Sequence, residues 1–193
     1  MKKASRITVL IISLVLISVY FVPVWEIELE APQYPEGLGM NIWINKITGD
    51  LNTINGLNHY IGMKTIQPDS IKELTLMPYI LGVLILLGIV TAMLNKRKLL
   101  LVWVIFFVLL GVAGGVDFYL WEYDYGHNLN PEAAIKIPGM SYQPPLIGTK
   151  QLANFTAISI PDTGGMILIG AGALSLLILL YDFKKKNKNI IIK

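Results

Sequence analysis

Four long apolar runs constrain the fold of this chain more than any other feature. They cover residues 7–25, 74–94, 99–121 and 164–183, each about the length a helix needs to cross a ~30 Å hydrocarbon core. The runs are continuous rather than alternating, which favours helices over the strands of a membrane barrel. The sequence therefore predicts an all-α membrane protein, a bundle of four transmembrane helices in one integral membrane domain, 1–193.

The basic residues predict how this bundle is oriented. Eleven of the sixteen lysines and arginines fall on one side of a four-span arrangement: Lys2, Lys3, Arg6, Lys96, Arg97, Lys98, Lys184, Lys185, Lys186, Lys188 and Lys193. The positive-inside rule makes this side cytoplasmic, so we expect both termini in the cytosol of a bacterial inner membrane. The net charge of +3 then reflects topology and contact with membrane lipid, and no basic patch interleaved with aromatic residues indicates a nucleic-acid partner.

Two extracytoplasmic loops, 26–73 and 122–163, remain outside the spans. In the first loop, polar and apolar residues alternate over 41–45 and turn signals follow, which predicts a short β-hairpin. Ser70 and Glu73 form a capping-box pattern before the second span. In the second loop, Asn130 followed by proline predicts a short helix that runs to Lys136.

The residues best suited to bind a metal all lie in these two loops. They are both histidines of the chain and three methionines that each follow a glycine: His59, His127, Met40, Met63 and Met140. The chain has no cysteine, and imidazole with thioether ligands favours copper, as Cu(I), over zinc or iron. His59 and Met63 are four residues apart, which places them on one face of either a helix or a strand. The alternative is that the methionines only fill apolar gaps and His59 only bonds a backbone carbonyl.

The loop carboxylates allow a further interpretation. Glu26, Glu28 and Glu30 alternate, and so do Glu122 and Asp124, so each set would share one face of an extended segment. Such faces could attract a cation or a basic partner, although a solvated surface is the commoner role. Asp117 lies near the outer end of the third span, where an ionisable group is costly and becomes a functional candidate.

Three stretches of the loops resemble a known family. "APQYPEGLGMNIWINKITGDL", "INGLNHYIGMK" and "IPGMSYQPPLIGTKQLANF" are similar to small four-span membrane proteins associated with nitrous-oxide reductase maturation gene clusters in Bacteroidetes-like bacteria. The resemblance implies the context of a copper-dependent extracytoplasmic enzyme that needs metal and electrons. It also implies that the family-like positions are Met40, His59, Met63, Met140 and His127.

The leading hypothesis is an accessory membrane protein that is not an enzyme, since no motif of a hydrolase, metalloprotease or nucleotide-binding protein occurs. Its loops would bind Cu(I) and deliver it to a periplasmic copper protein or a membrane maturation complex. The rival hypothesis is a metal-free scaffold or electron-transfer subunit of a membrane complex. A third is a quinol-interacting subunit that uses Asp117 and nearby tyrosines.

Overall fold

The computed structural model describes residues 1–190, apart from the side chains of 183 and 185–190. Lys193, counted in the charge bias above, lies outside the described residues, as do the side chains of Lys185, Lys186 and Lys188. The elements in chain order are α1 (Lys3–Val15), η1 (Leu16–Phe21), β1 (Trp25–Ala31), β2 (Tyr34–Ile42), β3 (Ile47–Gly49), α2 (Leu51–Ile61), η2 (Pro68–Ser70), α3 (Lys72–Leu94), α4 (Arg97–His127), β4 (Gly148–Leu152), β5 (Phe155–Pro161) and α5 (Thr163–Ile190).

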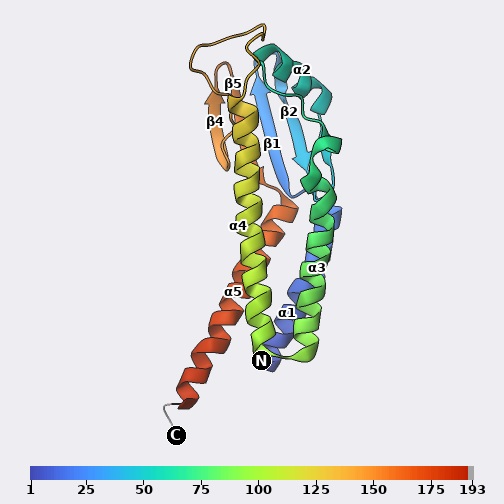
Figure 1. The fold of residues 1–193 in the computed structure, drawn as a ribbon, viewed down its shortest axis with the longest axis vertical. Helices are drawn as coiled ribbons and strands as arrows, with labels where there is room; N and C mark the ends of the chain where they lie inside the picture. The colour runs from blue at the N-terminus through green and yellow to red at the C-terminus, as the bar shows by residue number, and fades with distance from the viewer. Residues whose placement is uncertain (191–193) are drawn as a thin grey trace.

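Four helices are long and apolar enough to cross a membrane, which agrees with the four predicted spans. They are α1 continued by η1, α3, α4 and α5, and they lie alongside one another with the N-terminus and the end of α5 at the same end of the molecule (Figure 1). The first ends at Phe21 rather than at Trp25, because Trp25 already belongs to β1. The third continues to His127, six residues beyond its predicted end, so its last turns rise above the apolar run.

Tight side-chain contacts hold the four helices together. Trp103 of α4 is buried, and its indole nitrogen donates a hydrogen bond of 2.9 Å to the carbonyl of Leu84 in α3. Gly88 makes this approach possible, since a Cβ there would lie 2.1 Å from the hydroxyl of Ser13 and 3.0 Å from the Trp103 ring. The helices thus pack through specific contacts and do not merely share an apolar character.

The two loops together build one five-stranded antiparallel sheet, with strand order β3-β2-β1-β5-β4. A hairpin does form in the first loop, as β2 and β3, and it makes one edge of this sheet. Its position differs from the prediction, because the chain turns at 43–46, inside the predicted strand, and the predicted turn at 55–56 lies within α2. β1 is central and pairs with β2 from its own loop and with β5 from the other. The all-α prediction was therefore too narrow, because the fold is mostly helical with a small antiparallel sheet at one end of the helices.

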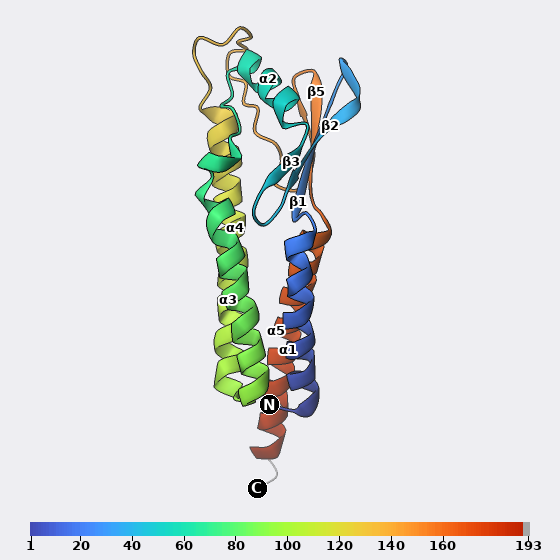
Figure 2. The same ribbon diagram turned by 90° about the vertical axis from the view of Figure 1, so that its right-hand side faces the viewer.

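The two faces of β1 differ in chemistry. Ile27 and Ala31 are buried on the inner face, and their register partners on β2 and β5 continue this face. Glu26, Glu28 and Glu30 alternate with them and point to the opposite face, so the prediction of a shared acidic face on an extended segment is confirmed for these three residues. The inner face packs against α2 and the last turns of α4, and Figure 2 shows α2 bridging from the end of α4 to the sheet. We call the five strands, α2, residues 118–127 of α4 and their connecting segments the cap.

Two local predictions were wrong. Ser70 does not cap α3, because it lies in η2 and its hydroxyl donates to the carbonyl of Gln67, while the N-cap position belongs to Ile71. Residues 131–136 form turns rather than a helix. There the side-chain oxygen of Asn130 accepts a 2.9 Å hydrogen bond from the backbone N–H of Glu132, which closes a tight turn instead of starting a helix.

Candidate functional site

A cavity of about 350 Å³ lies within the cap, between the inner face of the sheet, α2 and the end of α4. Aliphatic side chains and six aromatic residues form most of its wall; the aromatic residues are Tyr34, Tyr60, Trp121, Tyr125, Tyr142 and Phe155. The polar residues in the wall are Gln33, Asn58, Glu122 and Asn154. A largely apolar cavity with few polar groups is the usual form of a small-molecule binding site.

Glu122 is the most unusual residue of this wall. Its side chain is fully buried, and neither carboxyl oxygen has a hydrogen-bond partner within the described part of the chain. The loss of hydration raises the pKa of Glu122 to about 8, against the opposing attraction of the Lys150 charge. Glu122 lies roughly 36 Å along α4 from Lys98, at about 1.5 Å per residue, so it lies beyond a ~30 Å apolar layer and level with the sheet.

A close backbone approach holds the second loop against α4 beside Glu122. The N–H of Tyr142 donates a 2.9 Å hydrogen bond to the carbonyl of Gly126, one helical turn after Glu122. A Cβ at Gly126 would lie 2.4 Å from backbone atoms of Gln143, so only glycine permits this approach. The contact buries Tyr142 and brings its ring into the cavity wall.

The two loops also meet at the end of α2. Gly62 ends this helix in the left-handed conformation, with φ of 82°, and its carbonyl accepts a 2.7 Å hydrogen bond from the N–H of Asn130. The N–H of Ile135 donates to the carbonyl of Tyr60 at 2.9 Å. These bonds fix the second loop over α2, so residues from both loops line one cavity.

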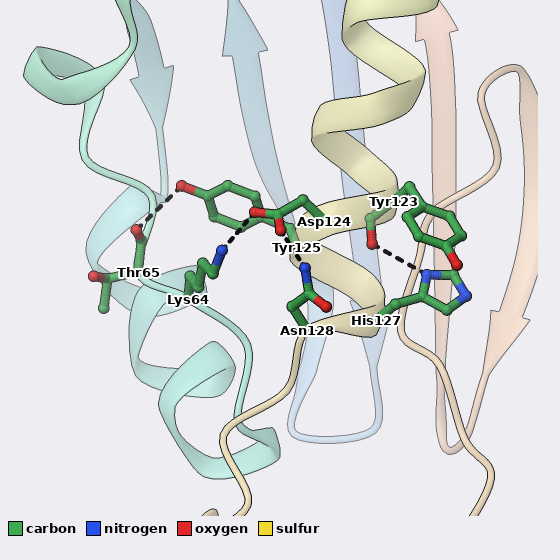
Figure 3. A network of polar contacts seen from close by, with 7 residues as sticks. All are labelled: Lys64, Thr65, Tyr123, Asp124, Tyr125, His127 and Asn128. Atoms are coloured by element: carbon green, nitrogen blue, oxygen red, sulfur yellow. Dashed lines mark hydrogen bonds and ion pairs between the residues drawn. The ribbon is translucent and has the colours of Figure 1, made fainter.

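A polar network ties the chain after α2 to the last turns of α4 (Figure 3). The ammonium of Lys64 lies 2.6 Å from the carboxylate of Asp124, which also accepts a hydrogen bond from the amide of Asn128. The bond from Lys64, followed by that from Asn128, lowers the pKa of Asp124. Tyr125 donates a longer bond of 3.4 Å to the carbonyl of Thr65. Because both charged groups of the ion pair are largely exposed, its role is positional more than energetic.

The cavity brings together two of the five predicted copper ligands. Met40 is buried on the inner face of β2, Met63 follows Gly62, and both line the cavity. His59, Met140 and His127 are not in the cavity wall. Among the residues that the structure describes, no three or more histidine, aspartate or glutamate side chains gather where a metal ion could sit. The copper role of the five residues stays a prediction.

Both histidines occupy other surroundings. His59 lies on the exposed side of α2, with its ring edge toward Tyr60. The His59–Met63 spacing assumed one regular element, but α2 ends at Ile61 and the chain reverses at Gly62. His127 stacks on Tyr123 with ring centroids 4.0 Å apart, and this pair lies across α4 from Lys64 in Figure 3.

Sequence reasoning placed Glu122 and Asp124 together on an extended segment, and this was wrong. Both lie in α4, where residues two apart point about 200° apart. Glu122 therefore points into the cap and Asp124 toward Lys64. If the third helix had been predicted to continue beyond Trp121, the inward direction of Glu122 would have followed, because Phe118, Glu122 and Gly126 share one helical face at intervals of four.

The structure thus consists of four long apolar helices and a cap that contains a largely apolar cavity with the buried Glu122 in its wall. No protein-family model matches the chain, and no curated protein matches it either.

Proposed function

We propose that this is a membrane-anchored accessory protein, not an enzyme, that binds a small molecule with an apolar body in the cavity of its cap. The observation that carries the proposal is the cavity itself, about 350 Å³ in volume and walled by residues from both loops. That volume lies within the range typical of small-molecule sites. The lining residues include no histidine, serine or lysine, so this wall lacks the usual nucleophile–base pair of covalent catalysis.

The charge distribution supports a placement for the cap. The basic residues near the N-terminus and in the α3–α4 turn lie at the end of the helices remote from the sheet. The positive-inside rule then puts that end in the cytosol of a bacterial inner membrane and the cap outside it. A ligand would reach the cavity from the extracytoplasmic space or from the outer leaflet.

A cavity-filling variant tests this proposal. Ala31 is buried in the cavity wall, and its neighbour Glu30 points to the opposite face of β1. Thermal unfolding would be followed in nanodiscs with and without 4-phenylbutan-1-ol, a neutral probe with an apolar body. Because a ligand that binds only the folded state raises its stability, the probe should stabilise the parent and Glu30→Leu, and fail to stabilise Ala31→Leu. Equal stabilisation of all three would mean that the probe acts through lipid or surface, and the proposal would fail.

A second candidate function is Cu(I) handling, and one observation favours it. Met40 and Met63 both line the cavity, and thioethers are soft ligands suited to Cu(I). The resemblance to proteins of nitrous-oxide reductase maturation supports the same role, with delivery to a periplasmic copper protein or a membrane maturation complex. In this version the methionine pair holds the metal, and His59, Met140 and His127 do not.

Competition with a Cu(I) chelator tests the copper role. The double variant Met40→Leu/Met63→Leu keeps apolar volume but removes both thioethers, so it should lose Cu(I) to the chelator more readily than the parent. Met140→Leu and His59→Ala serve as matched controls outside the cavity and should behave like the parent. Unchanged competition by the double variant would exclude a Cu(I) site at the cavity.

A further inference from the structure

We infer that the cavity ligand is an organic cation, an amine or ammonium with an apolar body, whose charged nitrogen is held by Glu122 among aromatic rings. The inference rests on the proposed binding function of the cavity and names the class of ligand. Three observations support it: the acid without a partner, the aromatic wall, and the lack of a basic residue in that wall.

The first observation concerns hydrogen bonding. A carboxylate offers about four acceptor positions, and buried polar groups in proteins nearly always have partners. Glu122 is fully buried beside the cavity with both oxygens unpaired among the described residues. A ligand ammonium would supply both N–H donors and a positive charge at this position.

The second observation concerns the rings. Trp121 and Tyr125 are one turn apart on α4, with ring centroids 4.5 Å apart, and Trp121 is the residue directly before Glu122. Tyr142 and Phe155 stack across the cavity wall with centroids 6.1 Å apart. The faces of aromatic rings attract cations, and an ammonium among several rings with one acid nearby gains from both.

The third observation concerns charge. No lysine, arginine or histidine belongs to the wall as described, so an anionic ligand would meet an acid and no base. Lys150 on β4 acts on Glu122 only from outside the wall, and its ammonium donates a 3.0 Å hydrogen bond to the carbonyl of Gln143. The other titratable groups that line the cavity are phenols, Tyr125 from α4 and three tyrosines from the strands, α2 and the second loop. A phenol offers no positive charge to pair with an anionic ligand.

This arrangement couples cation binding to proton release. With the pKa of Glu122 at about 8, the acid is mostly protonated at pH 7 in the protein without ligand. An ammonium binds the ionised form, so the carboxyl O–H bond breaks, the proton passes to solvent, and the carboxylate pairs with the cation. Below pH 8, affinity for the cation should then increase about tenfold for each unit by which the pH rises, and about 0.9 proton should be released per ligand at pH 7. A neutral ligand bonded to the protonated acid would release none.

The experiment uses the full chain in nanodiscs of zwitterionic lipid and two probes matched in shape, 4-phenylbutylamine and 4-phenylbutan-1-ol. Calorimetry in two buffers of different ionisation enthalpy gives affinity and proton release. The parent should bind the amine at least tenfold more tightly than the alcohol, with proton release at pH 7. Glu122→Gln should lose this preference and the proton release while it still binds the alcohol. Glu30→Gln, an acid on the opposite face of the sheet, should match the parent.

The outcomes separate the two proposals. Equal binding of amine and alcohol by the parent, unaffected by Glu122→Gln, would overturn the cation inference and leave the binding function intact. Binding of neither probe beyond that of Ala31→Leu would overturn the binding function itself. Retained alcohol binding shows that Glu122→Gln is folded, and the pH dependence of the unaltered protein tests the inference without any substitution.

Discussion

Replacing Glu122 by glutamine should remove the main pH dependence of cap stability. Burial raises the pKa of Glu122 from 4.5 to about 8, so the folded protein favours the neutral acid while the unfolded chain ionises near 4.5. Unfolding between these pH values releases a proton, and stability must fall as pH rises from 4.5 through 8. Above 8 the penalty is complete, because the acid is ionised in both states.

The size of the effect follows from the same two values. The interval between 4.5 and about 8, at about 1.4 kcal/mol per pH unit, corresponds to about 5 kcal/mol of unfolding free energy. For a chain of this length, about 2–4 °C per kcal/mol converts this to a fall of about 10–20 °C in melting temperature. Relaxation around the ionised group would reduce this value, so it is an upper bound.

Thermal unfolding in nanodiscs, followed by tryptophan fluorescence from pH 5 to 9, measures the difference. The parent should lose stability steadily up to pH 8 and then level off. Glu122→Gln keeps the shape of the side chain without its charge, so its profile should be flatter and should lie above that of the parent at pH 8.5. Glu30→Gln should retain the parent profile. Parallel profiles for the parent and Glu122→Gln would refute the assignment of a buried, unpaired acid.

Three other substitutions test how the cap is built, each by its effect on thermal unfolding. Gly126→Ala should destabilise the cap by about 1–3 kcal/mol and expose the second loop to trypsin, because the added Cβ meets backbone at 2.4 Å; Gly114→Ala, on an open part of the same helix, should cost nothing. Gly62→Ala should destabilise by more than about 1 kcal/mol, because φ is 82° and the site is crowded, whereas Gly56→Ala in the open should not. Lys64→Ala should change stability by less than about 1 kcal/mol, since its ion pair is exposed, and a larger loss would give the polar network an energetic role.

The helices could be predicted from sequence because their signal is local. An apolar run of about 20 residues has one structural solution in lipid, whatever the rest of the chain does. Only the ends of the runs depend on distant contacts. α4 continues to His127 because its last turns pack against the sheet, through Phe118, Trp121 and Tyr125, and no hydropathy pattern reports such a contact.

The sheet could not be predicted in the same way. β5 presents its small residues, Ala157 and Ser159, to the inner face and leaves Ile160 largely exposed, which inverts the usual hydrophobic pattern. The hydroxyl of the buried Ser159 accepts a 2.8 Å hydrogen bond from the indole N–H of Trp25, a residue far away in the chain. The pairing of β1 with β5 therefore depends on long-range packing that a local pattern does not encode.

In the candidate site too, some features follow from local sequence signals and others depend on distant contacts. The charge bias predicted that the candidate residues of both loops lie on one side of the membrane. In the structure, both loops contribute residues to one cavity. Whether His59 and Met63 share one face could not be predicted without knowing the backbone conformation of Gly62, which is left-handed and ends the helix. The burial of Glu122 depends on the continuation of α4 and on the approach of the second loop at Gly126. The sequence around Glu122 indicates neither of these features.

The buried acid is also the strongest physical reason to regard the cavity as functional. A glutamine or leucine at position 122 would avoid an ionisation penalty that reaches at most about 5 kcal/mol above pH 8, a large fraction of the stability of an ordinary domain. Only the charge of Lys150 offsets part of this penalty, and neither oxygen of Glu122 has a hydrogen-bond partner among the described residues. Strongly perturbed acids that lie in a cavity are more often found at binding or catalytic sites than in purely structural positions. A cationic ligand would supply the missing charge and hydrogen bonds together, so above pH 8, where the acid is already ionised, relief of this penalty would add to the affinity for the ligand.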